Sequence, residues 1–102
     1  MRVIARRSLR QFWLQSGRED AKTPLEMWHD EVTKANWHTP HDLKQHIGNA
    51  SICANNRVVF NIAGNKYRLV VEIQYRAGIV WVKFLGTHAE YDKIEVETVN
   101  EY

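Results

Sequence analysis

Residues 57–73 read RVVFNIAGNKYRLVVEI, and apolar side chains recur at every second position on both sides of Gly64-Asn65. A period of two predicts β-strands with one buried face. Gly64 and Asn65 both tolerate a positive φ, so they suit a two-residue hairpin turn. Such a turn pairs residues whose numbers sum to 129, which places Asn61 opposite Arg68. The segment therefore predicts an antiparallel hairpin with a defined register.

A third strand is predicted from Ile79 to about Leu85, after a turn at Arg76-Ala77-Gly78. A four-residue loop over 75–78 gives pairs that sum to 153. This register sets Val80, Val82 and Phe84 opposite Ile73, Val71 and Leu69. A slip by one residue would turn Lys83 into the apolar face, where an unpaired charge is costly.

The two faces of this predicted sheet differ in chemistry. Helices are expected to cover the apolar face, since their own apolar stripes also need a partner. The opposite face is expected to be open, basic and partly aromatic. It carries Arg57, Asn61, Arg68, Trp81 and Lys83. The alternative interpretation is a solvated sheet face on which Arg57 and Glu72 form an ordinary cross-strand ion pair.

The chain before these strands is predicted to be helical. Ser8 is expected to cap a first helix that runs to Gly17. Thr23 followed by Pro24 predicts the start of a second helix. Its apolar stripe comprises Leu25, Trp28, Val32 and Ala35.

The remaining elements are short. Thr39-Pro40 predicts a third helix that ends near Gly48. Residues 1–5 are expected to add an edge strand, and a capping box over 87–90 predicts a short helical turn. For residues 94–97 two alternatives stay open, a last strand or a helical extension.

Length and composition favour one globular domain over residues 1–102, with 44% hydrophobic and 25% charged residues. The longest apolar runs, such as residues 79–82, are far too short to span a membrane. Arginines interrupt the start of the chain before any stretch of signal-peptide length. A lone Cys53 cannot form an internal disulfide, which favours a cytoplasmic protein.

The net charge of +2 conceals a pattern along the chain. The four segments 1–22, 23–56, 57–88 and 89–102 carry net charges of +4, −2, +4 and −4. Two basic segments suggest a polyanionic partner, and solvated surface is the alternative.

Two groups of residues suggest RNA chemistry. Arg68 offers a planar fork of donors for phosphate oxygens, Lys83 adds a point charge, and Trp81 offers a surface for base stacking. Residues 87–93 add His88 at the end of the third strand. Cleavage of RNA without a metal needs a base, an acid and positive charge at phosphorus, and histidine is a natural proton shuttle. The alternative for residues 87–93 is simple helix capping.

A metal site is not predicted. Four histidines lie close in sequence, but they span a helix and a proline-containing loop and have no cysteine pair beside them. These are His29, His38, His41 and His46. The tryptophans of this half, Trp13, Trp28 and Trp37, are expected in the core or an interface.

Two long motifs, NKYRL over residues 65–69 and GTHAEYDK over residues 86–93, closely resemble those of HigB-type toxins of bacterial type II toxin–antitoxin systems. The resemblance covers most of the chain, from the arginine-rich first helix to the tail. It places the chain in the RelE-like superfamily. It implies an α+β fold in which two to three N-terminal helices pack on one face of a curved antiparallel sheet of three or more strands.

The resemblance also implies a function. Such toxins are mRNA interferases that usually cut message in the ribosomal A site, without a metal or other cofactor. The expected products have 2′,3′-cyclic or 3′-phosphate ends and 5′-hydroxyl ends. The expected partners are mRNA, the ribosome and a HigA-type helix-turn-helix antitoxin that represses the operon, in a complex expected to be a heterotetramer. No membrane partner is expected.

Site roles follow from the motifs together with the predicted open face. Arg68 is expected to stabilise transition-state charge, His88 to be the general acid or base with Tyr91 as the alternative, and Lys83 to add positive charge. The expected RNA-binding residues are Arg57, Asn61, Asn65, Lys66, Trp81, Asp92 and Lys93. Two other functions stay open: a toxin of the same superfold that poisons DNA gyrase, and a non-catalytic RNA-binding module.

Overall fold

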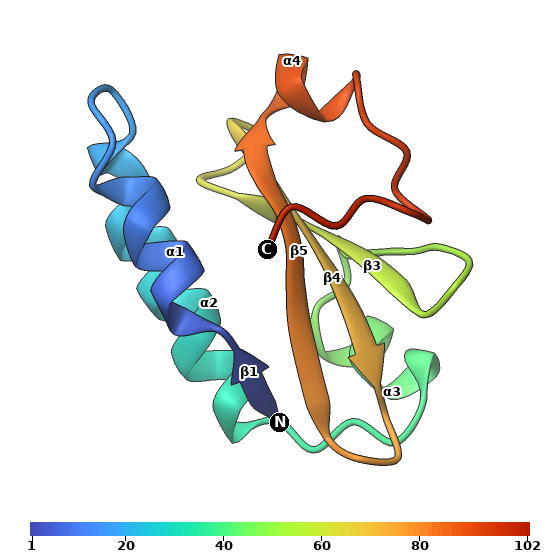
Figure 1. Ribbon diagram of the computed structural model, residues 1–102. Helices are drawn as coiled ribbons and strands as arrows, with labels where there is room; N and C mark the ends of the chain where they lie inside the picture. The colour runs from blue at the N-terminus through green and yellow to red at the C-terminus, as the bar shows by residue number, and fades with distance from the viewer.

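The computed structural model describes residues 1–102 as a curved five-stranded sheet with helices against it (Figure 1). The elements in chain order are β1 (Arg2–Ile4), α1 (Arg6–Trp13), the 3₁₀ turn η1 (Glu19–Ala21), α2 (Lys22–Lys34), α3 (Pro40–His46), β2 (Ser51–Ile52), β3 (Arg57–Ile62), β4 (Tyr67–Gln74), β5 (Ile79–Thr87) and α4 (His88–Tyr91). None of the helices combines the length and the apolar character that crossing a membrane requires.

The sheet has the order β1-β5-β4-β3-β2, in which only β1 runs parallel to its neighbour. The predicted register of the first hairpin is confirmed, because Asn61 pairs with Arg68 and all six β3–β4 pairs sum to 129. The Lys66 amide donates to the Ala63 carbonyl at 3.2 Å and closes the turn. The left-handed residues are Ala63 and Gly64, with φ of 55° and 67°, and not Asn65 as the sequence suggested.

The second hairpin follows the predicted register only up to its middle. Val71 pairs with Val82, as expected, but beyond a bulge Val70 pairs with Phe84 and Leu69 with Leu85. The prediction that Phe84 faces Leu69 is therefore wrong. The bulge absorbs one extra residue, so Leu85 enters the core while the charge of Lys83 stays out of it.

Helices cover one face of the sheet, as predicted. The main core joins strand residues such as Phe60 and Leu69 to Leu9 and Phe12 of α1 and to Leu25, Trp28 and Val32 of α2. Tyr67 meets Phe12 edge to face, with ring centroids 5.2 Å apart.

Two predicted helix starts are wrong. α1 begins at Arg6, so Ser8 lies inside the helix, where it is buried and caps nothing. α2 begins at Lys22, because the 3₁₀ turn η1 leads the backbone directly into it and Thr23 falls in its first turn. The third start is confirmed, since Thr39 accepts a hydrogen bond from the Asp42 amide. The predicted edge strand at residues 1–5 is confirmed by β1.

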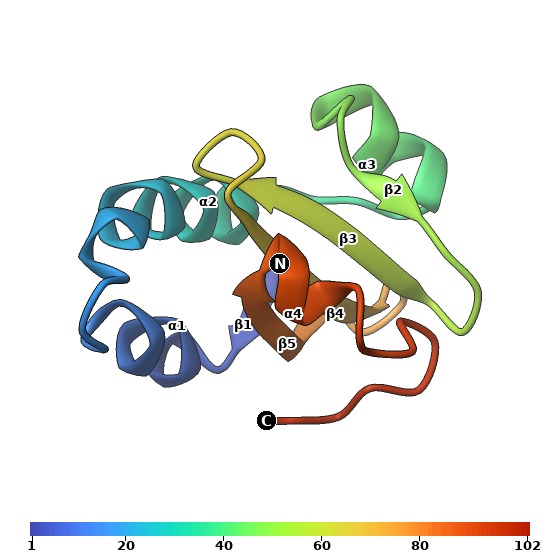
Figure 2. The same ribbon diagram turned by 90° about the horizontal axis from the view of Figure 1, so that it is seen from above.

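The other face of the sheet is not open. Val59, Val70 and Phe84 form a second small core there, covered by Tyr91 and by a tail, which we define as residues 94–102. The tail is neither of the two predicted elements: it turns at residues 95–99 and then runs back over β5, where the Glu101 amide donates to the Lys83 carbonyl. Figure 2 shows the tail on the side of the sheet opposite α2.

Candidate functional site

The two sheet strands that carry the motifs meet α4 at one end of the sheet. Arg68 pairs with Asn61 of β3 on one side and with Gly86 of β5 on the other. Because α4 begins directly after β5, His88 and Tyr91 lie next to this row. The bulge brings Arg68 one residue closer to His88 than the predicted register did, since that register placed Leu85 opposite Arg68.

Arg68 is held in position but keeps donors free. Its Nη1 donates to the Asn65 carbonyl at 3.0 Å, and its guanidinium carbon lies 5.9 Å from the centroid of the Tyr91 ring. The side chain forms no ion pair and is half-buried. Its remaining N–H groups are therefore available to an anionic oxygen.

Tyr91 lies between the arginine and the second core. Its ring packs on the cluster of Val59, Val70 and Phe84. Burial raises the pKa of the Tyr91 hydroxyl, and the nearby Arg68 charge only partly opposes this. Tyr91 is therefore protonated near neutral pH, which suits a hydrogen-bond donor or acid better than a base.

His88 is exposed on α4 and has an acidic neighbour. Its Nδ1 lies 3.2 Å from Oδ2 of Asp92, and its ring centroid lies 6.5 Å from that of Tyr91. A carboxylate at Nδ1 favours the tautomer with the proton on that atom, which leaves Nε2 of this exposed side chain as an acceptor.

Two contacts fasten α4 to the fold. The capping box predicted over 87–90 is confirmed, with the Thr87 amide donating to Glu90 at 2.8 Å. Glu90 also accepts from Arg18 at 2.9 Å, and these two donors hold the pKa of its carboxyl below the ordinary value. A Cβ at Gly86 would lie 2.7 Å from the Phe84 ring and 2.9 Å from the Glu90 carboxylate, so a larger residue there would displace these two side chains.

Lys66 turns toward the helices. It forms an ion pair with Asp20 of η1, and the Tyr67 hydroxyl donates to the same carboxylate at 2.6 Å. These hydrogen bonds lower the pKa of Asp20, and the pKa of Lys66 is raised. The cluster ties the β3–β4 turn to η1, and Lys66 is partly engaged there.

Two predicted open-face cations lie under the tail, so the prediction of an open face is wrong for them. Arg57 is only 7% exposed, and its Nη1 donates to the Val99 carbonyl at 2.6 Å. The Lys83 ammonium lies 3.1 Å from Oδ1 of Asn100 and 3.8 Å from a Glu72 oxygen, with its side chain 16% exposed. The apolar side chains of the tail pack on this face of the sheet, and the Val99 carbonyl and the Asn100 side chain occupy these two donors.

Of the other predicted residues, three lie near Arg68 or His88, and Trp81 and Lys93 lie elsewhere. Asn61 and Asn65 lie at the Arg68 end, and Asp92 accompanies His88. Trp81 lies five residues before Gly86 on β5, about 17 Å along the strand. Lys93 is exposed beside a separate hollow that Arg18 and Tyr102 also line.

The histidines of the helical half do not gather. His46 accepts from the Trp37 indole at 3.1 Å, and its Nε2 lies 2.9 Å from Glu31. No three His, Cys, Asp or Glu side chains lie close enough together to share an ion.

Local sequence spacing could not reveal the long-range contacts of this site. Arg18 and Glu90 are 72 residues apart, and Arg57 and Val99 are 42 apart. The alternation of Ile94, Val96 and the glutamates between them was the one signal that the tail has an apolar side.

A family model described as HigB_toxin, RelE-like toxic component of a toxin-antitoxin system, matches residues 21–94, which is more than half of the chain. A search of curated proteins finds no match. The matched range includes β3, β4, β5 and α4, and so contains the whole cluster around Arg68.

Proposed function

The chain belongs to the HigB family of RelE-like toxins from toxin–antitoxin systems, and from that premise we propose that it is an mRNA interferase. The observation that carries the proposal is the cluster of Arg68, His88 and Tyr91 where β4, β5 and α4 meet. It combines the Arg68 guanidinium, which keeps some of its donors free, with the exposed His88 imidazole and the protonated Tyr91 phenol. The imidazole has a carboxylate partner. These are the groups that cleavage of a phosphodiester needs.

The proposed reaction uses the 2′-hydroxyl of the RNA as nucleophile. Nε2 of His88 takes the hydroxyl proton while the 2′-oxygen bonds to the adjacent phosphorus. The bond from phosphorus to the 5′-oxygen breaks, and that oxygen receives a proton, which the protonated Tyr91 hydroxyl is proposed to donate. The products are a 2′,3′-cyclic phosphate and a 5′-hydroxyl.

Arg68 is proposed to stabilise the negative charge that develops in this step. The pentavalent phosphorane carries more negative charge on its oxygens than the ground state does. A guanidinium already oriented by the Asn65 carbonyl and by the Tyr91 ring meets that charge without reorganisation. Asn61 and Asn65 lie beside it and are proposed to position the RNA, and Asp92 is proposed to orient His88.

The binding partners are proposed from the same premise. A toxin of such a system has an antitoxin, and we take a HigA-type helix-turn-helix protein as the expected form. Ribosome-bound message in the cytoplasm is the proposed substrate.

Induced expression of the chain without antitoxin tests the function. We expect growth arrest, and primer extension on cellular message should show discrete new 5′ ends. Arg68→Ala should abolish both effects, because loss of one preorganised charge typically lowers turnover about 100-fold or more. Arg76→Ala is the matched control, since Arg76 is an exposed arginine in the β4–β5 turn, away from α4.

Two outcomes would point elsewhere. An SOS response with intact message would favour gyrase poisoning, and salt-dependent RNA binding without cleavage would favour a binding module. Full toxicity in both Arg68→Ala and His88→Ala would show that the active site lies elsewhere.

A further inference from the structure

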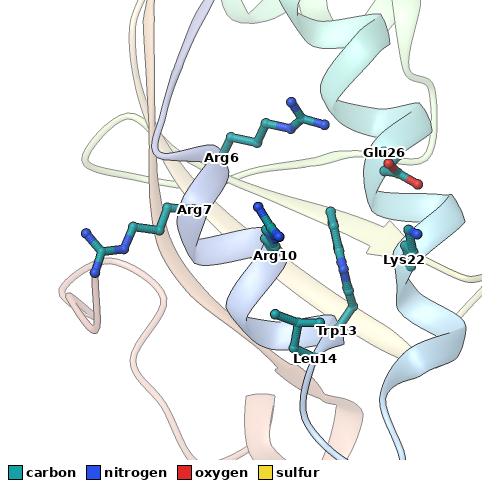
Figure 3. A pocket seen from close by; sticks show the side chains of 7 residues that line it. All are labelled: Arg6, Arg7, Arg10, Trp13, Leu14, Lys22 and Glu26. Carbon is teal, nitrogen blue, oxygen red and sulfur yellow. The ribbon is translucent and has the colours of Figure 1, made fainter.

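Helices α1 and α2 enclose a basic hollow of about 510 Å³ on the helical side of the molecule (Figure 3). Its lining residues are Arg6, Arg7, Arg10, Trp13, Leu14, Lys22 and Glu26. Figure 3 shows Arg6 extending toward α2, whereas Arg7 extends from the opposite side of α1. Four cations and one carboxylate thus surround a surface to which no strand contributes.

These cations have no partners within the chain. The ion pairs of the molecule involve Arg18, Lys34, Lys66, Lys83 and two histidines, and none of the cations of the hollow. Glu26 forms no ion pair with the cations beside it.

Folding does not explain why the arginines are there. Arg6 and Arg7 occupy the first turn of α1, where the helix dipole disfavours positive charge, and no acidic residue balances them. Arg6 and Arg10 are four positions apart, so they repel each other along the same helix face. No side chain caps the N-terminus of α1. The charges of Arg6 and Arg7 therefore weaken the isolated helix, which indicates that they serve a partner.

The floor of the hollow is apolar. Trp13 is 7% exposed at its base, and Leu14 is 67% exposed, more than any other large hydrophobic residue of the chain. A phosphate backbone would gain nothing from Leu14, whereas a peptide with acidic and apolar side chains would match both kinds of lining.

We propose that the hollow between α1 and α2 docks an acidic, amphipathic segment of the antitoxin. The inference rests on the proposed function only in that a toxin has an antitoxin. The acidic side chains would pair with Arg6, Arg10 and Lys22, and an apolar side chain would lie on Trp13 and Leu14.

The docking surface shares no residue with the cluster around Arg68. The hollow belongs to α1 and α2, whereas the cluster lies where β4, β5 and α4 meet. Loss of antitoxin binding and loss of cleavage can therefore be separated by mutation.

The test uses the full chain with Arg6→Gln, Arg10→Gln and Lys22→Gln combined, and the antitoxin cloned from the reading frame adjacent to its own. Titration of purified proteins should show antitoxin binding weakened about ten-fold or more, from the loss of three interfacial ion pairs. Induced cells should arrest even when the antitoxin is co-expressed. Because none of the three side chains forms an ion pair or a side-chain hydrogen bond within the chain, the variant should fold as well as the wild type, as its melting curve will show.

A second variant separates a peptide partner from RNA. Leu14→Ala removes only apolar surface, and should weaken antitoxin binding roughly five-fold. It should not change retention on a short RNA duplex. Arg76→Gln is the matched control for the arginine changes, and should leave antitoxin affinity unchanged.

The outcomes distinguish this inference from the proposed function. A triple variant that is toxic but still bound and neutralised normally would overturn the docking surface and leave the toxin intact. A triple variant that binds antitoxin normally but has lost toxicity would also overturn it, and would assign the hollow to RNA. A wild-type chain that neither arrests growth nor cuts message would refute the proposed function alone, since antitoxin affinity is measured separately.

Discussion

The two basic segments of the chain, residues 1–22 and 57–88, carry the same net charge of +4 but use it differently. Among the cations of the first segment only Arg18 forms an ion pair, with Glu90. In the second segment Arg57, Lys66 and Lys83 are engaged by the tail, by Asp20 and by Glu72. Only Arg68 among the sheet cations is both oriented and partly free.

The difference shows that net charge along a sequence does not equal charge available to a partner. The tail, which carries a net charge of −3 from Glu95, Glu97 and Glu101, does cover the basic face, but not through its glutamates. Its backbone and Asn100 take the donors, while Ile94, Val96 and Val99 pack on the second core. The helical cations, with no such cover, remain exposed.

Removing the tail should expose the cations Arg57 and Lys83, as the helical cations of residues 1–22 already are. A chain ending after Lys93 loses the apolar contacts of the tail with Val59, Val70 and Phe84, which should lower the free energy of unfolding by roughly 3 kcal/mol. Arg57 loses the Val99 carbonyl and Lys83 loses Asn100, so both become exposed surface cations, and Lys83 keeps only Glu72 at 3.8 Å. Urea denaturation measures the first effect, and steeper salt dependence of RNA binding measures the second. Unchanged stability would mean that the tail is not docked in solution.

Arg57→Ala tests one engaged cation by itself. It removes a buried charged donor and leaves the Val99 carbonyl without its partner, so unfolding free energy should fall by about 1–3 kcal/mol. Arg76→Ala, at an exposed arginine, should stay within about 0.5 kcal/mol of the wild type. If both substitutions lowered the unfolding free energy by the same small amount, the contact of Arg57 with the tail would not stabilise the fold.

Replacing an arginine of α1 should raise the free energy of unfolding, whereas Arg57→Ala should lower it. Arg6→Gln removes both its repulsion from Arg10 and its unfavourable interaction with the helix dipole, and should stabilise the free chain by about 0.5 kcal/mol. Thermal melting at low salt measures it, and high salt should diminish the gain. A loss of stability would show that Arg6 supports the fold.

Arg18 is the one cation of residues 1–22 with an ion-pair partner, and the pH dependence of stability tests its pairing with Glu90. Because the folded pKa of Glu90 is lowered, its contribution is present above the ordinary value of 4.5 and is lost as pH falls through the folded pKa. The glutamate side chain is 44% exposed, so solvent limits the effect to about 0.5 kcal/mol. Glu90→Gln should therefore differ from the wild type at pH 7, and the two should converge in acid. Parallel melting curves would contradict the pairing.

Sequence patterns predicted the fold where one local rule operates. The turn at Gly64 and the period of two gave the β3–β4 register without error, because a single hairpin determines it. The β4–β5 register failed at Lys83, since a bulge that keeps one charge out of the core has no local signature. The open face failed because its cover comes from residues more than 40 positions away, as Arg57 and Val99 show.

In the candidate site, too, local patterns predicted some features, and contacts between distant residues determined the others. Arg68, Asn61 and the capping box at Thr87 were placed from spacing and motif. The orientation of Arg68 by Tyr91, and the fastening of Glu90 by Arg18, depend on tertiary packing and had no signal in the sequence.

Single-turnover cleavage of message on purified translating ribosomes tests the separation of the two basic regions most directly. We compare the wild type with Arg68→Ala and with the combined variant Arg6→Gln, Arg10→Gln and Lys22→Gln. The account predicts that Arg68→Ala loses about 100-fold or more in rate, while the combined variant stays within roughly three-fold of the wild type. A combined variant that loses as much activity as Arg68→Ala would contradict it, because the helical cations would then belong to the RNA site.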